Sequence, residues 1–142
     1  MLTPLLLGCL FTTLSMAIEV IAAVAMIRYL IALQARREGN SFLFDFTALI
    51  ALLMGLFAGH LVQISLWAAL FLATREFHDF ATAFYHSAVN FTSLGYGDLV
   101  MSQQWRLLGA LEAANGVLMF GLTAAAIFAV MARLFQQRLG EH

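Results

Sequence analysis

The sequence predicts an all-α membrane protein with three membrane-spanning helices and one shorter helix that enters the membrane and returns. Three observations support this fold class. The 142 residues are 63% hydrophobic and 11% charged, whereas a soluble domain is about 45–50% apolar and about 25% charged. Three apolar stretches are long enough to cross a bilayer, which takes about 20 residues. A fourth apolar stretch, of about 12 residues, reaches only about half of the bilayer core.

The first spanning helix is expected from about residue 5 to residue 33, in an N-terminal segment 1–40 that also includes part of a short polar loop. Its apolar pattern is broken only by Glu19 and Arg28. Backbone groups inside a bilayer must be hydrogen-bonded within their own segment, so a helix fits this composition and an open strand does not.

Residues 41–142 are interpreted as a second unit with two more spanning helices, over 46–74 and 105–135. The helix at 46–74 contains His60 but no formal charge. Ionisable groups in a membrane usually face other helices and find partners. We therefore hypothesise that His60 contacts Glu19 and docks the first helix, the alternative being a bond from either residue to a backbone carbonyl or a serine.

Between these two helices, residues 79–91 predict the shorter helix. Asp79 stands where an N-cap belongs, and Thr82 follows in the first turn. Irregular backbone must follow such a half-helix. It is tolerated at membrane depth only where it is buried in protein or lines a water-filled path.

The arginines predict an orientation, because cytoplasmic loops carry an excess of basic residues. With three spans, one face of the membrane receives Arg36, Arg37, Arg133 and Arg138, and the other receives Arg75 and Arg106. We expect a multi-pass protein of the cell membrane, of the bacterial inner membrane, with the N-terminus outside and the C-terminus in the cytoplasm.

The loop at 92–98 reads Thr-Ser-Leu-Gly-Tyr-Gly-Asp and carries the most specific pattern in the chain. Gly95 and Gly97 occupy alternate positions, and glycine adopts positive φ at little steric cost. Alternating backbone conformations can point successive carbonyl oxygens the same way. Such oxygens can replace the water around an ion that crosses a membrane.

This loop resembles the filter of the potassium-channel family, whose pattern is Thr-Val-Gly-Tyr-Gly, usually preceded by Thr and followed by Asp. Ser93 stands in the filter-threonine place and Leu94 in the valine place. The layout is similar to small bacterial two-span pore-domain channels with one extra N-terminal helix. The stretches 105–113 and 115–121 look like their inner helix. The acid that the family often carries on its pore helix is replaced by Val89.

The resemblance implies a homotetrameric pore for passive K⁺ permeation, in which 46–74 is the outer helix, 79–91 the pore helix, 92–98 the selectivity filter and 105–135 the inner helix. K⁺ would be coordinated by Thr92, Ser93, Leu94, Gly95, Tyr96 and Gly97. Support for the filter is expected from Asp98, Tyr85, His86 and Glu112. Asp98 would bond Tyr85, His86 or a backbone amide.

Two roles are open for Glu112: a brace behind the filter through an amide of the pore helix or filter, or attraction of cations near the mouth. Gly116 and Gly121 are expected either to form a hinge at a gate or to allow close helix packing. For the whole chain, a non-conducting membrane subunit and a poorly selective cation channel are the alternative functions.

Other function classes find no support in the sequence. The net charge of −1 gives no sign of a nucleic-acid partner. We expect no enzyme activity, no cofactor beyond permeant K⁺, and only three identical subunits and membrane lipids as partners. The histidines, including His78, His86 and His142, lack the spacing of a metal site.

Overall fold

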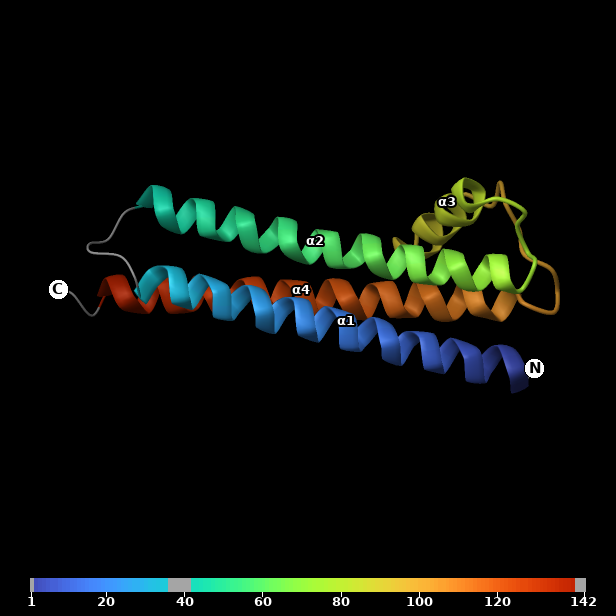
Figure 1. Ribbon diagram of the computed structural model, residues 1–142, viewed down its shortest axis with the longest axis horizontal. Coiled ribbons are helices and arrows are strands. Elements are labelled where there is room, and N and C mark those ends of the chain that lie inside the picture. Colours follow the sequence, from blue (N-terminus) through green and yellow to red (C-terminus); the bar gives the residue numbers. More distant parts are fainter. Residues whose placement is uncertain (1, 36–41, 140–142) are drawn as a thin grey trace.

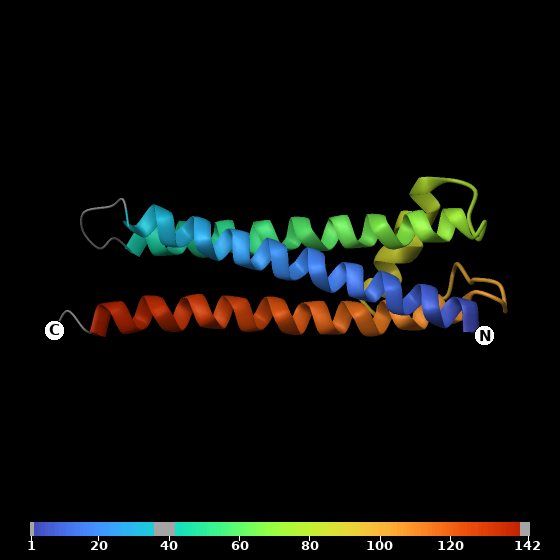
Figure 2. The ribbon, with the colours of Figure 1, turned by 60° about the horizontal axis from the view of Figure 1, so that its bottom comes forward.

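The computed structural model describes residues 2–35 and 42–139, and the regular secondary structure of these ranges is entirely helical. Three long helices run side by side, and a short helix lies against them at one end (Figures 1 and 2). The helices are α1 (Leu2–Ala35), α2 (Phe42–Ala73), α3 (Phe80–Phe91) and α4 (Arg106–Leu139). The predicted all-α fold with three long apolar helices is confirmed.

Each long helix has the length and composition of a membrane span. The apolar segments are Leu2–Leu33, Leu43–Ala73 and Arg106–Leu134, with mean hydropathies of 2.1, 2.0 and 2.1. Only a small share of their surface is buried inside the single chain, so most of their apolar side chains face outward. Lipid or further protein must cover these faces, and the chain is a multi-pass membrane protein.

The long helices extend beyond the apolar stretches from which they were predicted. α2 begins at Phe42 rather than at residue 46, because Phe42, Leu43 and Phe44 continue its apolar run and Asp45 in the first turn suits the positive helix end. α4 continues to Leu139 because glutamine, arginine and leucine are good helix formers. Helix formation therefore does not stop where the apolar span stops.

The two ends of the bundle differ. α3, the loop after it and the N-terminus lie at one end, and the C-terminus lies at the other (Figure 1). This placement of the termini follows from three spans, and the cytoplasmic side that the arginine pattern predicts stays a prediction. Arg36 and Arg37, on which that prediction partly rests, lie outside the described residues, as does His142.

Aromatic side chains fill the core beneath α3. Trp67 and Phe71 of α2 are fully buried there, together with Leu108 of α4. The Trp67 indole N–H donates to Ser15 Oγ of α1 at 3.2 Å, so this core also holds α1. Farther along the bundle, Leu52 and Leu56 form the centre of a second apolar cluster.

α3 begins as predicted at an aspartate cap. Asp79 has extended backbone, and its Oδ1 accepts from the Thr82 N–H at 2.9 Å. This bond satisfies one of the backbone donors that the first turn leaves without a partner, and the negative charge suits the positive end of the helix. The cap sets where α3 starts, and with it where the following loop begins.

Replacing Asp79 with alanine is expected to destabilise α3, and Asp79→Ser, which keeps a capping oxygen, should be milder. The Thr82 N–H lowers the pKa of the Asp79 carboxyl. Because this pKa is lower folded than unfolded, the stabilisation is present above the ordinary value of about 3.9 and is lost as the pH falls through the lowered value.

Thermal unfolding in detergent, between about pH 7 and about pH 3, measures this dependence. The difference in midpoint between wild type and Asp79→Ala should shrink in the acid range. A difference that stays constant over the whole range would show that the ionised carboxylate is not what caps the helix.

Candidate functional site

The predicted filter loop starts from an unusual end of α3. Thr92 closes the helix, and Ser93 follows with a positive φ of 57°. The Ser93 N–H donates to the Asn90 carbonyl at 2.8 Å, and the Leu94 N–H donates to the Val89 carbonyl at 2.9 Å. These two bonds form a Schellman motif, which turns the chain sharply out of α3 into the loop.

Positive φ then recurs at every second residue of the loop. The φ angles are 57° at Ser93, 61° at Gly95 and 74° at Gly97. Positive φ was expected at the two glycines but not at Ser93, because serine rarely adopts it. Its only signal was the position of Ser93 just after a helix end, where the helix-closing motif requires a left-handed residue.

In the single chain this loop is open on one side. Residues 92–98 are exposed, with Leu94 at 55% and Tyr96 at 66% relative exposure. A Cβ added at Gly95 or Gly97 would meet no atom within 4 Å. The described part of this chain therefore leaves the side chains of Leu94 and Tyr96 mostly uncovered.

Asp98 ends the loop and is tied back to α3. The Tyr85 hydroxyl donates to Asp98 Oδ2 at 2.8 Å, and the Leu99 N–H donates to Oδ1 at 3.1 Å. Of the three partners considered for Asp98, the structure shows Tyr85 and a backbone amide. The hydrogen bond to Asp98 stabilises the protonated form of the Tyr85 hydroxyl, so the pKa of this hydroxyl is raised. The loop is thus held at both of its ends by α3.

His86 does not bond Asp98, which was one of the contacts considered for it. Its imidazole lies within hydrogen-bonding distance of Asn90 Nδ2, at 3.0 Å, and packs against the rings of Phe71 and Phe77. His86 is buried and braces α3 against α2 rather than bonding Asp98.

Glu112 of α4 lies fully buried behind α3. Its Oε1 accepts from the Ser87 hydroxyl, which also approaches the Ile64 carbonyl of α2 at 2.8 Å. The expected brace to α3 is present through the Ser87 hydroxyl, and the side-chain amide of Asn90, also in α3, bonds the same carboxyl. Attraction of cations at the mouth is excluded, because a carboxylate with no exposed surface cannot face the mouth. Glu112 instead joins α4 to α3.

Replacing Glu112 with alanine is expected to lower the free energy of unfolding by about 2–4 kcal/mol, through loss of the Ser87 bond and the cavity left behind. Glu112→Gln keeps the acceptor oxygen and nearly the same volume, so it should cost less. Chemical unfolding of the detergent-solubilised protein measures both. If glutamine proved as damaging as alanine, the hydrogen bond to Ser87 would not be the main contribution of Glu112.

The return segment after the loop has an anchor that the sequence analysis missed. Glu76 accepts from the Ser102 N–H at 2.6 Å and from the Ser102 hydroxyl at 2.7 Å. The two residues are 26 positions apart, and neither belongs to a recognisable motif. Together with the Tyr85–Asp98 bond, this contact holds the loop at the end of the bundle.

Gly116 and Gly121 of α4 are not equivalent. A Cβ at Gly116 would overlap the carbonyl oxygen of Phe91, the last residue of α3. A Cβ at Gly121 would meet nothing within 4 Å. Close packing therefore accounts for Gly116, whereas no atom of the described residues lies within 4 Å of a Cβ added at Gly121.

The hypothesised contact between Glu19 and His60 is present, with 3.4 Å between Glu19 Oε1 and His60 Nε2. Both side chains are buried between the long helices. Two further partners, Gln63 and Thr123, complete this cluster. The sequence analysis did not identify them, because an isolated threonine or glutamine in an apolar helix carries no signal of what it faces.

Within the described residues, no group of three or more histidine, cysteine, aspartate or glutamate side chains could hold a metal ion. The sequence model of a family described as "Ion channel" matches residues 50–133. These residues contain most of α2, all of α3, the loop and most of α4. No curated protein and no solved structure matches the chain.

Proposed function

The chain belongs to the ion channel family, and from this premise we propose that it is one subunit of a homotetrameric channel for passive, potassium-selective permeation. The selectivity filter is the loop Thr92–Asp98, and K⁺ is coordinated by backbone oxygens of residues 92–97 with the Ser93 or Thr92 hydroxyl at the inner end. The permeant ion is the only ligand that the proposal requires, and no enzyme activity is part of it.

The observation that carries this proposal is the alternation of φ along the loop, positive at Ser93, Gly95 and Gly97. Left-handed residues at every second position suit a strand whose carbonyl oxygens line up toward one side. A strand of this kind can give an ion a series of oxygen ligands in place of its water. The C-terminal end of α3, which carries the negative end of the helix dipole, favours a cation beside it.

The number of subunits is inferred from what one chain leaves uncovered. The loop has irregular backbone and is exposed in the single chain, yet irregular backbone cannot face lipid. Further copies of the chain must enclose it around a water-filled path. Four copies would convert each carbonyl into a square of oxygens, which is the arrangement that potassium filters use.

The orientation is also a proposal. The loop and the N-terminus lie at the opposite end of the bundle from the C-terminus (Figure 1). Arg133 and Arg138 lie toward the C-terminal end, and Arg75 and Arg106 toward the loop. We place the loop outside the cell and the C-terminus in the cytoplasm of a bacterium.

Reversal potentials of the purified protein in liposomes, under opposing K⁺ and Na⁺ gradients, test the function. A potential close to the K⁺ equilibrium value is the expected result. Equal permeation of both ions would identify a poorly selective cation channel, for which Ser93 and Leu94 are the departures from the family pattern. Absence of current would contradict permeation and favour a non-conducting subunit.

A further inference from the structure

A single carboxylate in α1 connects the N-terminal helix to both long helices of the pore unit. Glu19 is 1% exposed and lies outside the residues that match the channel family. Its Oε2 accepts from Gln63 Nε2 of α2 at 2.8 Å, and its Oε1 accepts from the Thr123 hydroxyl of α4 at 2.8 Å. His60 Nε2 lies 3.4 Å from Oε1 and 3.1 Å from the same hydroxyl.

The hydrogen bond from the Thr123 hydroxyl to Glu19 joins α4 to α1. Among the described hydrogen bonds, it is the one that joins these two helices. Ala22, Ala23 and Met26 of α1 and Ala126, Ile127 and Val130 of α4 pack against the same apolar cluster. Apolar contacts of this kind are non-directional. A buried carboxylate needs its partners, because an unpaired one inside a membrane is costly. Glu19 therefore fixes where α4 sits relative to α1 at this level.

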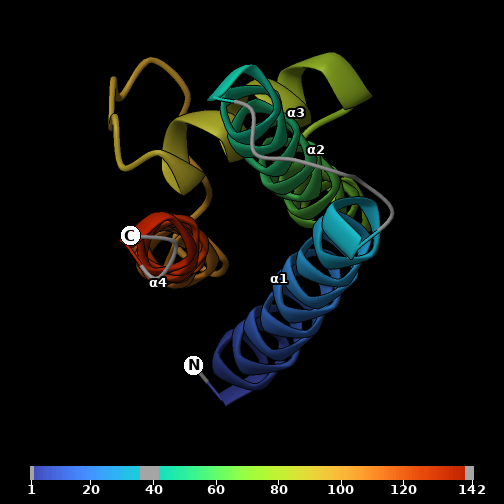
Figure 3. The same cartoon turned by 90° about the vertical axis from the view of Figure 1, so that its left-hand side faces the viewer.

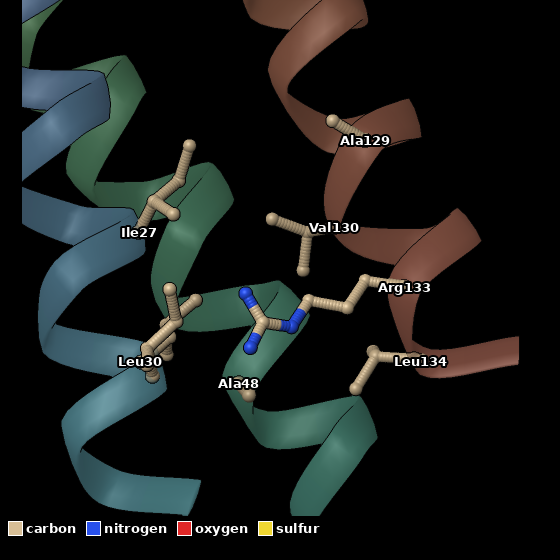
Figure 4. A pocket seen from close by; sticks show the side chains of 8 residues that line it. Ile27, Leu30, Ala48, Ala129, Val130, Arg133 and Leu134 are labelled. Carbon is tan, nitrogen blue, oxygen red and sulfur yellow. The ribbon is translucent and has the colours of Figure 1, made fainter. Parts of the chain in front are cut away.

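Thr123 lies at a boundary along α4. On its N-terminal side, Gly116 lies directly against the Phe91 carbonyl, and this contact fixes the N-terminal part of α4 to α3. Toward the C-terminus, Ala126, Ile127 and Val130 of α4 pack against the apolar cluster around Leu52 and Leu56, and a pocket of about 170 Å³ lined by α1, α2 and α4 lies beside them. Figure 4 shows Ala129 and Val130 of α4 facing this pocket opposite Ile27 and Leu30, with the Arg133 side chain reaching across. The C-terminal part of α4 is thus held to α1 and α2 by non-directional apolar contacts beside a pocket, and the Glu19 bond is the polar contact at the start of that part.

The direction of the restraint follows from the arrangement of the helices. Viewed along the bundle, α1 lies on one side of α4 and the loop after α3 lies on another (Figure 3). The exposed side chains of α4 in the single chain include apolar Val117, Leu118 and Phe128. Apolar constrictions close a pore by excluding water. If four such surfaces approached each other, the path below the filter would close.

We infer that Glu19 is a positioning residue that holds the C-terminal part of α4 toward α1, and so keeps the path below the filter open. This inference rests on the proposed function for its consequence, but the restraint itself is a property of the single chain. The N-terminal helix is then a working part of the pore rather than an additional membrane anchor.

K⁺ uptake into liposomes tests the consequence. Glu19→Ala and Thr123→Val should each lower uptake about fivefold, with the K⁺/Na⁺ ratio unchanged because the filter is not touched. The double variant should resemble Glu19→Ala, since the bond that Thr123→Val removes is already lost in that variant. Thr123→Ser should take up K⁺ as the wild type does, because serine keeps the hydroxyl that Thr123→Val removes. Thr13→Ala is the matched control, because the Thr13 hydroxyl bonds only the Cys9 carbonyl of its own helix.

Spin labels test the restraint without relying on conduction. Labels at Val24→Cys and Phe128→Cys, both exposed positions, report the α1–α4 separation in a Cys9→Ser background with an excess of unlabelled chains. Glu19→Ala should lengthen or broaden the distance distribution, and Thr13→Ala should not.

The two measurements separate the two ideas. A longer distance in a protein that carries no current at all would support the restraint while contradicting the proposed function. A conducting wild type with unchanged uptake in both single variants would overturn the inference, as would an unchanged distance distribution. Increased uptake in Glu19→Ala would also overturn the inference, because it would mean that Glu19 holds α4 in a closed position in the wild-type protein.

Discussion

Replacing Gly95 with alanine is expected to abolish potassium selectivity and most of the K⁺ current. Gly95 has a φ of 61°, a conformation that costs an L-residue about 1–2 kcal/mol. A Cβ at this position would meet nothing within 4 Å in the single chain, so the penalty there is conformational and does not come from crowding. In a ring of four chains the strain would be repeated in each strand and would disturb the alignment of the carbonyl oxygens. The reversal potential under K⁺ and Na⁺ gradients measures the loss.

Gly121→Ala is the matched control for this substitution. Gly121 lies within α4 and also has open space around it, but its φ is in the ordinary helical range. Alanine is a better helix former than glycine by about 1 kcal/mol, so the variant should be at least as stable as wild type. Intact potassium selectivity in Gly95→Ala would show that the filter has been assigned to the wrong residues.

Replacing Gly116 with alanine is expected to lower both the stability of the protein and its K⁺ current. The added Cβ would overlap the Phe91 carbonyl oxygen, with the Phe91 carbonyl carbon also too close. These are backbone atoms, which cannot rotate away as a side-chain end can, so α3 and α4 must separate. Overpacking typically costs about 1–3 kcal/mol, and we expect the upper part of that range. Because Phe91 ends α3 directly before the loop, loss of K⁺ current should accompany the loss of stability.

Thermal unfolding and K⁺ uptake, measured on the same preparations, check this expectation. Gly121→Ala again provides the comparison, because it adds the same methyl group to the same helix five residues away. A Gly116→Ala protein with wild-type stability and uptake would mean that α3 and α4 are farther apart than the structure shows. Loss of uptake at full stability would instead favour a hinge at Gly116.

Much of the architecture could be predicted because it depends on the composition of single segments. Three apolar stretches of sufficient length must be helical in a bilayer, whatever their neighbours are. The start of α3 is equally local, since an aspartate before an apolar helix caps it wherever the helix packs. The glycines at positions 95 and 97 indicated positive φ because few other residues adopt it readily.

The contacts that the sequence left open or missed are those in which a partner from a distant part of the chain decides the outcome. Two roles were open for Glu112, and its bond to the Ser87 hydroxyl depends on how α3 crosses α4. Ser93 was not expected to have positive φ, because that follows from the way α3 ends and not from serine itself. Glu76 and Ser102 meet only because the loop folds back.

The sequence by itself determined that the long helices of this protein lie in a lipid bilayer, how many helices were expected, and that Gly95 and Gly97 adopt positive φ. Each of these follows from the chemistry of a short segment. The tertiary structure alone decided that Gly116 is a packing residue and Gly121 is not, that Glu112 bonds α3, and that Glu19 joins three helices through His60, Gln63 and Thr123. The physical reason is that an apolar helix has many faces of similar hydrophobicity. Which face meets which neighbour depends on the fit of all the helices together.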